Sequence, residues 1–457
     1  MKLRIEKTNK NLSFLGGAPM IEELLKSVNF NSRYNAVLPT LKYKGFQDSF
    51  YKFKAMVCSF ISECDCLDDI DELNQDPAYL EMIDHKAYTP KTYGNFLRSF
   101  NEKNIYDMQN ATIDLNLRLR SKLEPDFIRQ GKIGENLMIL DCDSTKNRQY
   151  AQKMEGVEIN HEKNLSLDTQ NIFDELGFQY HIDVRAGATH SSNGAGLAAA
   201  NVIRQIKANK KYGDKKFWMR ADSGYYGHKF FNALLAVGCD FIVAVNKGGK
   251  SFPKILGQIH NWSTTDLEDS DRIKFYDGRE CEIGSTNYRI KDCERRLRYV
   301  VMRAKKPSKG TLFEDHTEYD YFAFCTSLDE LRLDDIELIR TYRKRGQAEN
   351  YIKEMKYAFD LKHYPCLKLS ANNAYAAIAC VAYNLMRFIG LMEVDGYTNG
   401  KPKLSKKIRK QLLFIPCLVA RTGRDRRIVT TKLYYERICA YVAKLKKISI
   451  GSLDCYV

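Results

Sequence analysis

Two apolar runs in the sequence end in aspartate, a pattern that suits a divalent-metal site. Residues 137–147, LMILDCDSTKN, contain Asp141 and Asp143, and residues 216–222, KFWMRAD, end in Asp222. Side chains alternate across a strand, so Asp141 and Asp143 share one face. Ligand sites in α/β sheets gather at the carboxyl ends of strands, and Mg²⁺ prefers oxygen ligands. One such aspartate is weak evidence because aspartate also starts turns, but two strand ends together indicate a hard-metal site.

A third carboxylate lies on a helix expected over residues 341–361. At 100° per residue, four of its polar side chains fall within roughly a 60° arc. They are Tyr342, Arg345, Glu349 and Lys356. An adjacent apolar stripe would pack against the sheet, so one flank of the helix would present a carboxylate among an arginine, a lysine and a phenol. An exposed helix with incidental charge pairs would show the same spacing, and the helix alone leaves both interpretations open.

The pattern of helix-like and strand-like segments divides the chain into five parts. A chain of 457 residues is too long for one ordinary core. Residues 1–125 predict a mainly helical region, and residues 126–246 alternate strands with helices, which predicts an α/β layer. Residues 247–330 contain short β-rich runs that predict an all-β insertion. Residues 331–395 return to helix, and residues 396–457 form a basic, helical C-terminal region.

The positive charge of the chain is concentrated near its C-terminus. The formal net charge is +15, from 72 Lys and Arg against 57 Asp and Glu. Residues 401–457 hold fifteen of the bases and three of the acids, and so contribute +12. The stretch 420–429 contains Arg421, Arg424, Arg426 and Arg427. A solvated helical surface would explain this charge, but arginine is the bidentate phosphate donor, and we favour a surface that tracks the phosphates of a polyanionic partner.

Composition disfavours secreted and membrane proteins. The thirteen cysteines are scattered without the spacing of metal ligands, which indicates reduced thiols in a cytoplasmic protein. The first ten residues lack the apolar stretch of a signal peptide. Residues 374–392 are apolar and long enough to span a membrane, but Asn384 and Arg387 interrupt them. We therefore expect a buried core helix and no membrane partner.

The motifs resemble those of a known family. Tyr342, Arg345, Glu349 and Lys356 match without a gap the Y-R-E-K signature of cut-and-paste insertion-sequence transposases of the IS-four superfamily. "DCDST" resembles the Asp-x-Thr motif of that family at Asp143, and "RADSGYYG" resembles its second-aspartate motif at Asp222. "AYNLMRF" and "IPCLVARTGR" look most like the IS-thirteen-eighty branch. The resemblance covers about residues 135–430, and it is interrupted at 158–184, where this chain is more polar than that branch usually is.

The resemblance implies a fold, an activity and a cofactor. It implies an α/β fold with an RNase H-like catalytic core, interrupted by the all-β insertion and flanked by the helical N-terminal and basic C-terminal regions. It also implies that Asp143, Asp222 and Glu349 hold two Mg²⁺ ions, for which Mn²⁺ can substitute, and catalyse two-metal phosphoryl transfer on DNA. The Asp-x-Thr match singles out Asp143 as the ligand, and Asp141 becomes a structural acid.

The same resemblance suggests partners and DNA contacts. The substrate would be double-stranded DNA, cleaved at the terminal inverted repeats of an insertion sequence and joined to target DNA by a homodimer in the bacterial cytoplasm, at the nucleoid. Arg345 and Lys356 would bind phosphates, and Tyr342 would donate a hydrogen bond to one of them. A route through hairpin ends would need an aromatic platform for a flipped base. Trp262 is the one tryptophan in the insertion, and it equally fits a core or surface aromatic.

Two other functions compete with an active transposase. A transposase-derived DNA-binding protein without catalysis would be expected to have lost one of the acids, whereas Asp143, Asp222 and Glu349 are all present. Another RNase H-like nuclease, such as a resolvase, is disfavoured by the Y-R-E-K helix. We therefore expect a metal-dependent DDE transposase.

Overall fold

The protein contains a ten-stranded mixed sheet. The computed structural model describes residues 5–41, 45–85, 88–160, 162–264, 273–307, 318–423 and 425–448. The strand order is β3-β4-β2-β6-β7-β11-β10-β9-β8, with β5 also paired to β4. The strands are β2 (Leu137–Arg148), β3 (Glu158–Ile159), β4 (Leu165–Asp174), β5 (Gln179–Ala186), β6 (Lys216–Ala221), β7 (Cys239–Ala244), β8 (Ser263–Thr264), β9 (Glu282–Tyr288), β10 (Leu297–Lys305) and β11 (Tyr319–Thr326). Strands β2, β6 and β7 are parallel to one another. The fold is therefore mixed α/β.

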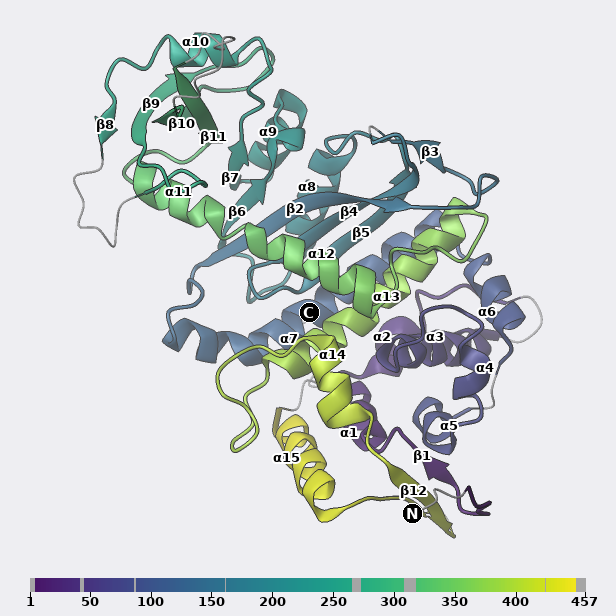
Figure 1. Cartoon of the computed structure of the whole chain (residues 1–457). Helices are drawn as coiled ribbons and strands as arrows, with labels where there is room; N and C mark the ends of the chain where they lie inside the picture. The colour runs from purple at the N-terminus through teal and green to yellow at the C-terminus, as the bar shows by residue number, and fades with distance from the viewer. Residues whose placement is uncertain are drawn as a thin grey trace.

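Helices cover the sheet and build most of the N-terminal region. They are α1 (Ala18–Ser27), α2 (Phe30–Tyr34), α3 (Gly45–Ile61), α4 (Ile70–Leu73), α5 (Pro77–Ile83), α6 (Pro90–Leu97), α7 (Glu102–Arg129), α8 (Ala195–Lys207), α9 (His228–Leu235), α10 (Phe252–Leu256), α11 (Asp335–Arg343), α12 (Gly346–Ala358), α13 (Leu369–Leu391), α14 (Ser405–Ile408) and α15 (Lys432–Ile448). Figure 1 shows α12 lying across β2, and α13 packs on β5. A second, three-stranded sheet of β1 (Leu12–Ser13), β12 (Cys417–Thr422) and β13 (Asp425–Val429) joins the two ends of the chain.

The segment expected as an all-β insertion extends the main sheet. Its strand β11 pairs antiparallel with β7, with Phe324 opposite Ala244, and β10, β9 and β8 follow outward. The expectation that this segment is entirely β is wrong, because it also contains the short helix α10. Pro253 lies in the first turn of α10, where proline favours a helix start, and Phe252 and Ile255 are buried beneath it.

Helix α13 is the buried core helix that the sequence predicts. By length and composition it could cross a membrane, but its apolar stretch is entirely buried inside the protein. The two polar side chains that interrupt its apolar stretch bind the turn from β4 and the start of β5. Asn384 accepts a hydrogen bond from the Gln179 amide (2.8 Å), and Arg387 donates one to the Leu176 carbonyl (2.8 Å). Buried polar groups are tolerated when they are paired in this way.

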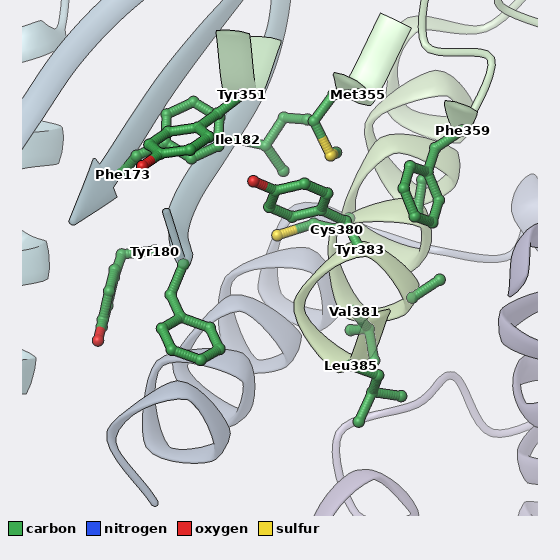
Figure 2. Close-up of a cluster of buried hydrophobic side chains, with 14 of the residues drawn as sticks. Phe173, Tyr180, Ile182, Tyr351, Met355, Phe359, Cys380, Val381, Tyr383 and Leu385 are labelled. Atoms are coloured by element: carbon green, nitrogen blue, oxygen red, sulfur yellow. The ribbon is translucent and has the colours of Figure 1, made fainter. Parts of the chain in front are cut away.

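Aromatic packing holds α12 against both the sheet and α13. Figure 2 shows Tyr383 of α13 among side chains that come from α12 and from β4. The ring centroid of Tyr383 lies 5.7 Å from that of Phe359 and 6.2 Å from that of Phe173. On α12 itself, Tyr351 lies 5.6 Å from Phe173. Such pairs stabilise beyond the area they bury, so the position of α12 over the sheet is well determined.

One buried arginine ties β2, β6 and the end of α11 together. The parallel register places Asp141 of β2 opposite Arg220 of β6. Arg220 donates from Nε and Nη2 to the two oxygens of Asp141, each at 2.7 Å, and from Nη1 to the Thr341 carbonyl at 2.6 Å. Both side chains of the ion pair are at most 3% exposed. We call this arrangement of Arg220, Asp141 and Thr341 the clamp.

Breaking the clamp should destabilise the fold. Asp141→Asn leaves the buried guanidinium of Arg220 without its counter-charge, and we expect the free energy of unfolding to fall by about 3–5 kcal/mol, measured by chemical denaturation. The matched control is Asp126→Asn, because Asp126 pairs with Arg129 on the exposed surface and such pairs contribute little. An Asp141→Asn variant as stable as the wild type would contradict a structural role for the clamp.

Candidate active site

The β2–β6 register also brings the two predicted aspartates level. Cys142 pairs with Ala221, so the next residues are Asp143, inside β2, and Asp222, directly after β6. The expectation that the first strand ends at Asp143 is wrong, because β2 continues to Arg148. Asp222 follows β6 and caps the short 3-10 helix η1 (Ser223–Tyr225), and its Oδ1 accepts a hydrogen bond from the Gly224 amide at 2.8 Å. The Asp143 side chain is 10% exposed and that of Asp222 is 42% exposed. One acid is therefore recessed and the other is open to solvent.

Glu349 on α12 completes a set of three carboxylates around one cleft, which we call the acid cleft. Its volume is ≈ 480 Å³. It is lined by Asp143, Ser144, Thr145, Asp222, Arg345, Glu349, Ile352, Lys353, Lys356 and Tyr357. Glu349 is exposed to solvent. The structure thus brings the three sequence-predicted acids together from β2, from the turn after β6, and from α12.

Arg345 lies between the two aspartates. Its Nη2 is 3.1 Å from Oδ2 of Asp143 and 3.6 Å from Oδ2 of Asp222. Burial, together with the charges of Asp222 and Glu349, raises the pKa of Asp143 to about 6 against the opposing effect of Arg345. The pKa of Arg345 is raised by the surrounding carboxylates, Asp143 first, although burial disfavours its charged form. The guanidinium is thus the nearest counter-charge of the acid pair.

The donor set suits a hard divalent cation in its chemistry, since it offers three carboxylates and no thiol or imidazole. Within the described residues, however, no three His, Cys, Asp or Glu side chains stand close enough together to hold one metal ion. The guanidinium of Arg345 is near both Oδ2 atoms instead. The three carboxylates therefore suit a divalent metal ion by their chemistry. In this structure the Arg345 guanidinium, not a metal ion, is the counter-charge beside the two aspartates.

The single helix expected over 341–361 is broken into two, and this divides the four signature residues. Helix α11 ends at Arg343 and α12 begins at Gly346, because the Arg345 amide bonds back to the Tyr342 carbonyl (2.8 Å) in a tighter turn and Gly346 is a weak helix former. Arg345, Glu349 and Lys356 line the acid cleft. Tyr342 does not continue their arc.

The side chains of Tyr342 and Lys356 both make contacts within the protein. Burial raises the pKa of the Tyr342 phenol, whose ring lies 4.7 Å from that of Phe324. Tyr342 lines a neighbouring cleft of ≈ 570 Å³, which Arg345 and Glu349 also line. Burial lowers the pKa of Lys356, which donates to the Lys146 carbonyl at 3.0 Å.

The remaining predicted DNA-binding residues lie outside the acid cleft. Trp262 is half-buried, and the guanidinium of Arg303 stacks 4.0 Å from the centre of its ring. Arg421 and Arg426 belong to the β12–β13 hairpin, which Figure 1 places beside β1 at the far end of the molecule from the insertion. Arg427 is on the same hairpin, and Arg424 lies outside the described residues.

The arginines of the hairpin differ in how far neighbouring acids neutralise them. Arg421 donates to Glu81 at 2.8 Å. Arg426 pairs with Glu81 at 2.8 Å and with Asp84 at 3.0 Å. Arg427 bonds to the hydroxyl of Thr422, and it is exposed. The charge available to an external phosphate is therefore greatest at Arg427.

Sequence reasoning missed Arg220, Ser144 and Lys353. Arg220 precedes Asp222 by two residues, as Asp141 precedes Asp143, so parallel pairing of the two strands would have predicted the ion pair. Ser144 shares a hydrogen bond with Ser191 (2.8 Å), which fixes the loop after β5 against the acid cleft. Lys353 follows Glu349 by one helical turn, and the i, i+4 spacing was the available signal.

Comparisons with known proteins identify the family. The family model described as "Transposase DDE domain group 1" matches residues 1–449. No curated protein matches the chain. Among solved structures, a cryo-EM structure of the piggyBac transposase synaptic complex with hairpin DNA is similar at 10% identity, over 98% of this chain and 89% of that chain, with a TM-score of 0.38. That likeness is distant, and the family match spans nearly all of the 457 residues. The chain belongs to the DDE transposase family.

Proposed function

We propose that the protein is the DNA transposase of a bacterial insertion sequence, similar to the IS-thirteen-eighty branch of the IS-four superfamily. It binds the terminal inverted repeats, cleaves the DNA at the ends, and joins them to target DNA by cut-and-paste transposition. The observation that supports this best is the acid cleft, which Asp143, Asp222 and Glu349 line from three parts of the chain. The strand order β5-β4-β2-β6-β7, with α8 and α9 as connections, supports an RNase H-like core.

Asp143, Asp222 and Glu349 are the residues that would hold metal. Two Mg²⁺ ions, or Mn²⁺ in their place, would supply Lewis-acid activation of a water or a DNA 3′-hydroxyl and would stabilise the leaving oxygen. The chain itself supplies the positioning. Lys353 and Lys356 place ammonium groups on the wall of the acid cleft, where they would bind the phosphates that flank the reacting one.

The proposal extends to the assembly and its location. Because two transposon ends must be cut and joined together, a homodimer in the synaptic complex is proposed, in the bacterial cytoplasm at the nucleoid. Hairpin ends are compatible with the chemistry, and Trp262 would need Arg303 to leave its ring before a flipped base could stack on it. The alternative is a catalytically silent DNA-binding protein. The presence of all three acids around one cleft favours the active enzyme.

Loss of any cleft acid should abolish cleavage and leave folding intact. Asp143→Asn, Asp222→Asn and Glu349→Gln each remove one proposed metal ligand. With Mg²⁺ and duplex DNA carrying the inverted repeats that flank the gene, we expect end cleavage to fall by about 10²–10³-fold or more. The measurement is strand cleavage on a denaturing gel, with thermal unfolding of each variant run alongside.

The matched control for these variants is Asn350→Ala, on the same helix, because Asn350 is exposed and does not line the acid cleft. It should cleave like the wild type. Full cleavage by Asp222→Asn, or no cleavage by the wild-type protein, would refute the assignment of the active site.

The hairpin arginines should contribute unequally to DNA binding. We expect Arg427→Gln to reduce the slope of log affinity against log salt by about 0.9, the value for one phosphate contact. Arg426→Gln should change the slope less, because Glu81 and Asp84 already neutralise Arg426. Fluorescence anisotropy with a labelled duplex at several salt concentrations measures both slopes. Equal slopes for both variants and the wild type would exclude the hairpin from the DNA interface.

A further inference from the structure

The Arg345 guanidinium contacts two carboxylates of the acid cleft through one nitrogen, and its Nε has no hydrogen-bond partner among the described residues. The Nη2 atom is shared between Oδ2 of Asp143 (3.1 Å) and Oδ2 of Asp222 (3.6 Å). The Nε atom is buried and has no hydrogen-bond partner among the described residues. A buried donor left without a partner is costly, so this position of the side chain is held by the two carboxylates.

The position of Arg345 conflicts with metal binding. A cation held by Asp143 and Asp222 would compete with Arg345, which already contacts both carboxylates, because two positive charges placed so close together repel each other strongly. Among the described residues no three acids stand close enough together to hold one metal ion, which agrees with an arginine, rather than a metal, beside the two aspartates. Metal and guanidinium are thus alternative counter-ions of one acid pair.

Arg345 has a second place to go. It also lines the neighbouring cleft of ≈ 570 Å³, which contains Tyr276 and Arg343. The residue stands in the turn between α11 and α12, and the next residue, Gly346, has open space where a side chain would be. Arg345 therefore borders two clefts, and only one of them contains the aspartates.

We propose that Arg345 is an internal counter-ion that competes with the divalent metal in the DNA-free protein, and that a DNA phosphate releases the acids by taking the guanidinium. This rests on the proposed function, because it assumes that the acid cleft holds metal. Metal and DNA then bind with positive coupling. By linkage, DNA raises the affinity for metal by the same factor by which metal raises the affinity for DNA.

The test measures Mn²⁺ binding to the full-length, DNA-free protein by electron paramagnetic resonance of the free ion. Arg345→Gln should bind Mn²⁺ about tenfold more tightly than the wild type, a factor typical of coupled sites. The matched control is Arg343→Gln, which removes the same charge nearby, since Arg343 bonds to the Lys274 carbonyl and stacks over Tyr276. It should bind Mn²⁺ like the wild type.

A double variant distinguishes the counter-ion role of Arg345 from the metal site itself. In Asp143→Asn/Arg345→Gln the gain should vanish. If Arg345→Gln binds no more tightly than the wild type while Asp143→Asn still loses binding, the counter-ion role is overturned and the metal site stands. If Mn²⁺ binding is independent of Asp143 in every variant, the metal site and the counter-ion role both fall.

A measurement on the wild type needs no stable Arg345 variant. A duplex carrying the inverted repeat that flanks the gene should raise Mn²⁺ affinity about tenfold, after subtraction of the Mn²⁺ bound by the same duplex with Asp143→Asn protein. Unchanged Mn²⁺ affinity in the presence of bound duplex would overturn the proposal.

Discussion

One buried ion pair fixes the register of β2 against β6, and the acid cleft depends on that register. Arg220 and Asp141 face each other across the parallel strands, each two residues before an acid of the cleft. Because side chains repeat every two residues along a strand, fixing this pair fixes Asp143 and Asp222 on one face. The hydrogen bond from Arg220 to the Thr341 carbonyl extends the constraint towards α12, which carries Glu349.

Two aspartates of one strand thereby acquire different chemistry. Asp141 is 1% exposed and both its oxygens are bound by the clamp arginine. Asp143 has one counter-charge, Arg345, which it shares with Asp222. Glu349, Lys353 and Lys356 line the same cleft, so its three acids face one arginine and two lysines. Burial and pairing separate the structural acid, Asp141, from the proposed metal ligand, Asp143.

The parts of the site that depend on local periodicity could be predicted from the sequence, and those that depend on tertiary pairing could not. The strands that carry Asp143 and lead to Asp222 followed from apolar runs, and α13 followed from its length and composition. The expected strand end at Asp143 was wrong, because β2 continues to Arg148. The break before Gly346 was missed because a continuous 100° repeat was assumed through residues 341–361. The pairing of β11 with β7, which joins the insertion to the main sheet, joins residues about eighty apart and has no local signal.

The central claim is that Asp143, Asp222 and Glu349 form the metal site of a DNA transposase. Anomalous scattering from Mn²⁺ in crystals of the protein bound to a duplex carrying its flanking inverted repeat tests this most directly. The predicted result is anomalous density in contact with all three carboxylates, with the Arg345 guanidinium withdrawn from the aspartates. Density elsewhere, or an Arg345 still bridging Asp143 and Asp222 beside bound DNA and excess Mn²⁺, would contradict it.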